Sequence, residues 1–218
     1  MLKLQSMKDN RMGGVALIVG TIGGVITLLI HPSGHDLFAP DQFAHTAYLL
    51  VVAHALAIVS VAALFLGGLA IARHLASPDR LAIAALVVFG FACAAVISSA
   101  TVDGFVGPAV LRKVIFEPPQ VSNQWRVLLA YNDQLNQAFA QIFVVAWAMA
   151  IVLWSASILK SRLLGPAAGI YGLFVGTASV IAVVAGVSGH AEATHLVMLG
   201  QIIWFPIVGI LMWRLKES

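Results

Sequence analysis

The fold is decided by the stretch from Thr46 to Ala72, which reads TAYLLVVAHALAIVSVAALFLGGLAIA. It contains no Asp, Glu, Lys or Arg, and it exceeds the roughly 20 apolar residues that cross a bilayer as a helix. The whole chain has the same character, because 61% of its 218 residues are hydrophobic and only 10% are charged. Soluble domains carry about 25% charged residues. The composition therefore predicts a protein whose main solvent is lipid.

Further apolar stretches on both sides of this one predict a single domain of six membrane-spanning helices. The approximate limits of the six spans are residues 13–31, 44–74, 81–101, 128–159, 166–188 and 192–213. Strands are not expected, because an open sheet cannot satisfy its backbone in lipid and the alternation of a barrel is missing. The segment 108–116 is amphipathic enough to lie on the membrane surface, with a plain connecting loop as the alternative. The predicted fold class is an all-α membrane bundle.

Positive charge is distributed unevenly between the two predicted sides of the membrane. Of the 12 Lys and Arg residues, only Arg112, Lys113 and Arg126 fall on the side opposite the chain ends. The positive-inside rule then places both termini in the cytoplasm. We therefore expect a multi-pass protein of the inner (cytoplasmic) membrane whose longer loops face the periplasm. Nucleic-acid binding is not expected, because no basic stripe is interleaved with aromatic residues.

Histidines gather at the outer ends of the spans. A weak parallel repeat relates the first two spans to the last two, because Ser-Gly-His follows the first and fifth spans and another histidine opens the next span. The repeat predicts one outward-facing metal site formed by His35, His45, His190 and His195, with Glu192 beside it. Imidazole and carboxylate ligands suit zinc, copper or iron. The alternative is that these histidines simply lie at the polar interface.

The start of the fourth span carries a second polar group. Asp133, Gln137 and Gln141 are spaced four residues apart and form a stripe along one helix face. Because polar groups facing lipid are costly, we expect the stripe to face the bundle interior or water, where Gln201 of the sixth span can meet it. The functional interpretation is a pocket that opens outward, with Asp133 as a base, ligand or proton carrier and the three glutamines as binding residues. The alternative is hydrogen bonding between helices.

His54 lies deeper than the other outward histidines, and an ionisable group inside a span is a functional hypothesis by default. Nine residues separate it from His45, so the two rings point to opposite helix faces and cannot share one ion. His54 is predicted to bond the stripe of Gln137 and Gln141, to ligate haem, or to be a structural histidine with a satisfied partner. Asp103, in the sequence Thr-Val-Asp-Gly, is predicted to cap a loop, with a metal or pocket role as the alternative.

Three classes of function fit these features. The first is a metal-dependent membrane enzyme that acts on a lipid-like or small hydrophobic substrate, with Asp133 and Glu192 as acid–base groups. The second is a b-type haem protein, which is disfavoured because only one histidine is deep. The third is a non-catalytic binding or transport module, or an accessory subunit of a larger membrane complex. The bilayer is the expected partner, and self-association is a further option.

Overall fold

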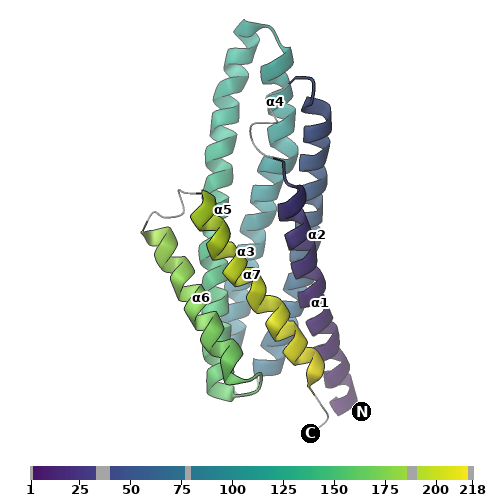
Figure 1. Cartoon of the computed structure of the whole chain (residues 1–218), viewed down its shortest axis with the longest axis vertical. Helices are drawn as coiled ribbons and strands as arrows, with labels where there is room; N and C mark the ends of the chain where they lie inside the picture. Colours follow the sequence, from purple (N-terminus) through teal and green to yellow (C-terminus); the bar gives the residue numbers. More distant parts are fainter. Residues whose placement is uncertain (1, 33–39, 77–79, 186–190, 216–218) are drawn as a thin grey trace.

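The computed structural model describes residues 2–32, 40–76, 80–185 and 191–215, with side chains from residue 10 onward except at 191–198. These residues are almost entirely helical, and none of them forms a β-strand. Figure 1 shows the helices as a bundle of long rods. The all-α prediction is therefore confirmed for the described part of the chain.

The described residues form seven α-helices and one π-helix, and α3, η2 and α4 follow one another without a break. In order they are α1 (Leu2–Ile30), α2 (Phe43–Ala76), α3 (Leu81–Thr101), the π-helix η2 (Val102–Val106), α4 (Gly107–Phe116), α5 (Pro119–Ser161), α6 (Pro166–Val184) and α7 (Ala191–Arg214).

Five helical segments are long and apolar enough to cross a membrane. They are Asn10–Ile30, Phe43–Ala76, Leu81–Phe116, Pro119–Ser161 and Pro166–Val184. In α7, the part with described side chains, Leu199–Arg214, is a shorter apolar helix. The helices support a membrane protein, whereas the count of six spans and the parallel repeat stay predictions.

The rod formed by α3, η2 and α4 runs beside α5, and this pair extends furthest from the chain ends (Figure 1). The segment predicted to lie on the membrane surface or to form a loop is instead helix α4, which continues α3 and packs against α5. Pro108 lies in the first turn of α4, directly after the π-helix η2, and the rod continues through it. The 43 residues of α5 reach about 65 Å, well beyond the roughly 30 Å hydrocarbon core of a bilayer.

Large aromatic side chains form the centre of the bundle. The ring of Phe89 in α3 lies 4.9 Å from that of Trp147 and 5.1 Å from that of Trp154, both in α5. Trp154 also stacks on Trp204 of α7, with ring centroids 6.1 Å apart. The Trp154 indole N–H donates to the Ala82 carbonyl, so the buried polar atom is satisfied. This cluster joins α3, α5 and α7.

The first and last helices cross at two glycines. A Cβ on Gly209 would lie 2.8 Å from the carbonyl oxygen of Gly14, and a Cβ on Gly14 would lie 2.5 Å from that of Gly209. Small residues allow membrane helices to approach this closely. The beginning of α1 and the end of α7 consequently lie together at one end of the bundle (Figure 1).

Candidate metal centre

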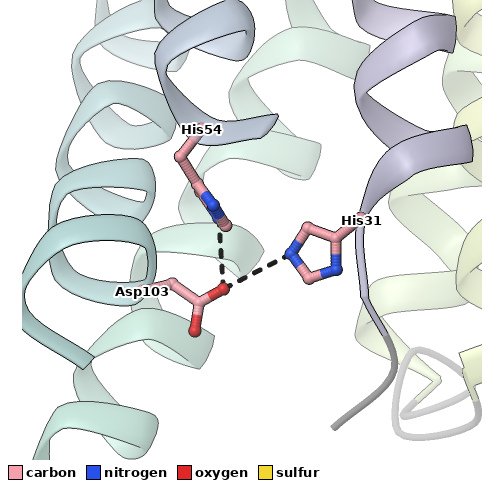
Figure 2. Close-up of side chains that lie close together, drawn as sticks. All are labelled: His31, His54 and Asp103. Carbon is pink, nitrogen blue, oxygen red and sulfur yellow. Dashed lines mark ion pairs between the residues drawn. The ribbon is translucent and has the colours of Figure 1, made fainter. Parts of the chain in front are cut away.

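Three ionisable side chains from separate parts of the chain point toward one another (Figure 2). His31 directly follows α1, His54 lies in α2 and Asp103 lies in η2. One nitrogen from each ring and one carboxylate oxygen all lie within 4.8 Å of one another. It is the one group of three or more His, Cys, Asp or Glu residues with such spacing in the described part of the chain.

The two rings converge on one carboxylate oxygen. The Nε2 atom of His54 is 3.1 Å from Oδ2 of Asp103, and the Nε2 atom of His31 is 3.6 Å from the same oxygen. The ring centroids are 5.0 Å apart. The His54 side chain is 10% exposed, while those of Asp103 and His31 are 34% and 38% exposed. The cluster is therefore buried on its α2 side and open to small molecules on the other.

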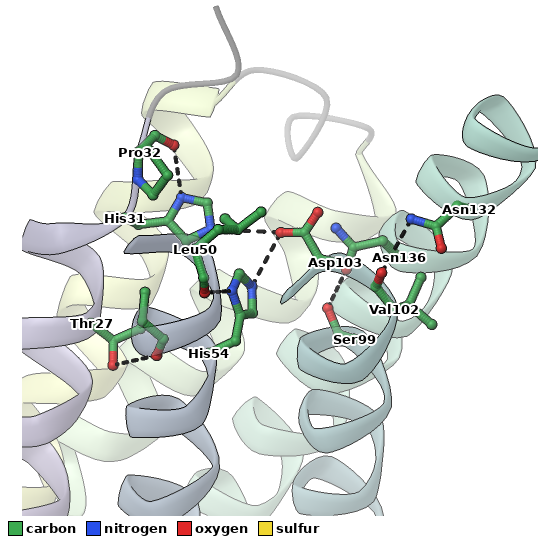
Figure 3. Close-up of polar contacts among 11 residues, drawn as sticks. Thr27, His31, Pro32, Leu50, His54, Ser99, Val102, Asp103, Asn132 and Asn136 are labelled. Carbon is green, nitrogen blue, oxygen red and sulfur yellow. Dashed lines mark hydrogen bonds and ion pairs between the residues drawn. The ribbon is translucent and has the colours of Figure 1, made fainter. Parts of the chain in front are cut away.

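Backbone carbonyls hold the opposite nitrogen of each ring (Figure 3). The Nδ1 atom of His54 is 2.8 Å from the Leu50 oxygen, and that of His31 is 3.1 Å from the Pro32 oxygen. A carbonyl only accepts, so each Nδ1 carries a hydrogen, and a neutral ring then has its lone pair on Nε2. Both lone pairs face the Asp103 carboxylate, which is also an acceptor. A metal ion between the three groups, or protons shared among them, would satisfy this arrangement.

The site favours positive charge at the ring nearest solvent. The hydrogen bond to Asp103 raises the pKa of His31 above its ordinary value of 6.5, and the opposing effect of partial burial is smaller. The negative charge of the carboxylate acts in the same direction as the hydrogen bond.

A π-helical turn presents Asp103 to the two histidines. Such turns inside longer helices occur frequently at functional sites. The next residue, Gly104, packs against His54, and a Cβ there would lie 2.8 Å from Nδ1 of His54 and closer still to its Cβ and Cγ. The missing side chain at Gly104 therefore allows η2 to approach α2 closely enough for Asp103 to reach His54.

Further polar contacts connect the neighbouring helices around the cluster (Figure 3). The amide of Asn132 in α5 donates to the Val102 carbonyl of η2 at 3.2 Å, and Asn136 accepts a hydrogen bond from a serine hydroxyl of α3. The hydroxyl of Thr27 in α1 lies 3.4 Å from the Ala53 carbonyl of α2. These contacts hold η2 against α5, and α1 against α2, on either side of the three ionisable residues.

A cavity of about 520 Å³ opens beside Asp103, between its rod and α5. Apolar side chains such as Leu111 and Leu129 form much of its wall, and Arg126 and Asp133 add one charge of each sign. Arg126 makes no ion pair within the described ranges. The volume of the cavity falls in the range of small-molecule sites. The cavity can therefore admit water and a small ligand to the Asp103 carboxylate.

The structure describes one side chain of the predicted four-histidine site. His45 is exposed on α2 and is not part of the cluster. His35 and His190 lie outside the described residues, as do the side chains of Glu192 and His195. The four-histidine site therefore stays a prediction, separate from the cluster seen here.

The predicted stripe on α5 differs from the polar contacts that the structure shows. Asp133, Gln137 and Gln141 are exposed, in agreement with the water-facing alternative of the prediction, and Gln137 donates to Asp133 at 2.9 Å. Asn132 and Asn136 turn inward instead, because adjacent helix positions differ by 100° around the axis. His54 consequently bonds Asp103 rather than the two glutamines of the stripe. Gln201 is buried, and its Nε2 atom has no hydrogen-bond partner in the described residues.

The sequence does not single out His31 as a ligand, and it predicts a metal role for Asp103 only as the alternative to a loop cap. Asp103 is the only acid between Leu81 and Phe116, and a lone carboxylate in an apolar helix requires a cationic partner. That signal was present in the sequence. The sequence did not identify the partners of Asp103, because they lie in other parts of the chain.

Comparison of the chain with protein-family profiles, curated proteins and solved structures found no match. The function therefore has to be inferred from the chemistry of the His31, His54 and Asp103 cluster, which can hold a metal ion.

Proposed function

We propose that this protein is a membrane metalloprotein whose centre is formed by His31, His54 and Asp103. The orientation of the two rings carries the proposal, since both Nε2 atoms face the carboxylate while both Nδ1 atoms bond backbone carbonyls. Metal-ligating histidines usually donate their other N–H to a carbonyl or carboxylate, which fixes the tautomer and the ring orientation. The cluster has the features of a ligand set arranged before the ion binds.

Two imidazoles and one carboxylate suit zinc or non-haem iron. Three protein ligands leave a coordination position open, which distinguishes catalytic from structural zinc sites. The partial exposure of His31 and Asp103 supports access to such a position. We therefore favour a reactive centre over one that only holds helices together.

The reaction class that we propose is metal-assisted attack of water on a lipid-like or small hydrophobic substrate. A bound divalent ion supplies a water of lowered pKa and polarises a substrate oxygen. The neighbouring cavity has an apolar wall for such a substrate, with Arg126 able to bind a substrate oxygen and Asp133 able to accept a proton. In this proposal the cavity is the substrate site.

We also propose that the centre faces the periplasmic side of the inner membrane. His31 directly follows the end of α1, so the cluster lies at the opposite end of that helix from the beginning of the chain. The excess of Lys and Arg on the side of the chain ends supports a cytoplasmic location for both termini.

Metal analysis of the purified protein tests the proposed centre. We expect about one zinc or iron ion per chain and a loss of metal affinity of at least about tenfold in His31→Ala, His54→Ala and Asp103→Asn. His45→Ala is the matched control, because His45 lies on the same helix as His54 but outside the cluster. Retention of metal by Asp103→Asn together with its loss from His45→Ala would favour the four-histidine site instead.

A visible spectrum of the same preparation separates the alternatives. A Soret band that disappears in His54→Ala would indicate haem b and overturn the proposed centre. If the protein is colourless and binds no metal at any metal-to-protein ratio, the positive charge in the cluster comes from protons rather than from a metal ion. That result would favour a binding or transport module, or an accessory subunit.

A further inference from the structure

A stripe of mostly apolar side chains runs along one face of α5 with a seven-residue repeat. This stripe, the α5 seam, consists of Val121, Gln124, Leu128, Tyr131, Leu135, Ala138, Ile142, Val145 and Met149. Successive members are three and four residues apart, which is the spacing of positions a and d in a coiled coil. Eight of the nine side chains are hydrophobic. Such a repeat over four heptads is typical of a helix that pairs with another helix.

The bundle leaves the α5 seam uncovered. Every residue of the seam is exposed or half-buried. Leu128, Tyr131 and Ile142 are 48%, 66% and 53% exposed. The buried side chains of α5, such as Asn132 and Trp147, all lie outside the seam. The described part of the chain therefore provides no helix that packs on this face.

The first half of the seam lies outside the lipid core. Residues 139–159 of α5 contain no charged side chain and are long enough to cross the hydrocarbon. Residues 119–138 instead carry exposed polar side chains, which are costly in lipid. They are Asn123, Gln124, Arg126, Asp133, Gln134 and Gln137. Val121, Leu128 and Tyr131 belong to this polar half, and a contiguous apolar patch exposed to water marks an interaction surface.

The charge pattern of α5 favours a second copy of this chain as the partner. Residues 119–159 contain two charged side chains, Arg126 and Asp133. Both occupy position f of the heptad, which faces away from a coiled-coil partner, so two seams can meet without like charges between them. Charged residues at positions e and g select unlike partners, and α5 has none there.

The membrane determines the direction of such a pair. Copies inserted in the same orientation present their α5 helices in parallel, and a two-fold axis along the membrane normal then places each seam residue opposite the same residue of the partner. Hydrophobic side chains of the seam would thus meet hydrophobic side chains along its whole length.

We propose that this protein forms a parallel dimer through the α5 seam. Arg126 and Asp133 line the cavity beside Asp103. Because both lie at position f, away from the seam, each copy keeps its own cavity open in the dimer. The proposal is independent of the metal centre, since none of the three cluster residues belongs to α5.

Disulfide cross-linking in native membranes tests the proposal. Single cysteines are placed in a Cys93→Ala background, because Cys93 is the only cysteine. Leu128→Cys places a thiol in the seam, and Ala130→Cys is the matched control, since Ala130 is also exposed but lies on the opposite face. With a mild oxidant, Leu128→Cys should give a disulfide-linked dimer of the chain as the main product, whereas Ala130→Cys should stay monomeric.

A charge exchange at Leu128 tests the same contact without a cross-link. Leu128→Glu would place two like charges opposite each other, so the Kd of the dimer should increase by at least about tenfold. Energy transfer between labelled copies in liposomes of increasing lipid-to-protein ratio measures this Kd. Ala130→Glu should leave it unchanged. A mixture of Leu128→Glu and Leu128→Lys chains should restore pairing, which would exclude unfolding as the cause of the loss.

The remaining outcomes would overturn the proposal. Equal cross-linking of the two cysteine variants would indicate random collision. A native chain that stays monomeric at every lipid-to-protein ratio would leave lipid as the occupant of the seam. A Leu128→Cys product whose mass differs from that of two chains would identify a different membrane protein as the partner.

Discussion

At the scale of single residues, the Asp103 carboxylate determines the charge of the candidate centre. Its ion-pair partners among the described residues are His31 and His54. Removing one partner leaves the others without their counter-charge, and this matters most for His54, whose side chain is only 10% exposed. Asp103, His31 and His54 therefore form one unit whose charge is balanced only when protons or a metal ion are present.

This charge balance predicts that the metal-free protein loses stability as the pH rises. The hydrogen bond to Asp103 raises the pKa of His31 above 6.5, so the protonated ring stabilises the folded state. That contribution is fully present below pH 6.5 and is lost as the pH rises through the raised pKa. We expect Asp103→Asn to lower the thermal unfolding midpoint more at about pH 6 than at about pH 9, measured in detergent with a chelator.

The His31→Ala background is the control for this measurement. The same Asp103→Asn substitution should show a smaller pH dependence there, because the ring that titrates is absent. A destabilisation by Asp103→Asn that increases with pH in the otherwise native chain would contradict the assignment.

At the scale of elements, the π-helix η2 and its glycine determine whether the site forms. We expect Gly104→Ala to reduce metal affinity by at least about tenfold, because the added methyl group displaces His54. Alanine is the better helix former, so loss of the helix would not explain this result. Gly107→Ala is the matched control, since a Cβ there meets its nearest atoms at an ordinary 3.5 Å. Metal affinity should be measured by competition with a chelator, and equal losses in both variants would contradict the specific role of Gly104.

The rotation of α5 about its axis is a second element-scale result. The sequence pattern identified a polar stripe that begins at Asp133, but the inward contacts come from Asn132 and Asn136. One residue of offset changes the face by 100°. Spacing alone identified the polar helix segment correctly, but the selection of its inward face required the contacts with α3 and η2.

At the scale of the whole molecule, orientation in the membrane decides which compartment the centre faces. Cys93 is the only cysteine and is buried, so Cys93→Ala provides a background for single-cysteine labelling. In spheroplasts, a membrane-impermeant maleimide should label Asn123→Cys, near the start of α5. It should label Leu163→Cys, in the turn before α6, only after permeabilisation. Both positions are exposed, so the opposite labelling pattern would show that the centre faces the cytoplasm.

The sequence by itself determined the helical class and the apolar segments, because lipid leaves the backbone few ways to satisfy its hydrogen bonds. It also indicated that His54 requires a partner inside the bundle. Only the tertiary structure decided that the partners are Asp103 and His31. The helices are apolar on nearly every face, so their patterns do not specify how each one is rotated. Close contacts specify that rotation, and the packing of Gly104 against His54 is the one that brings the three ligands together.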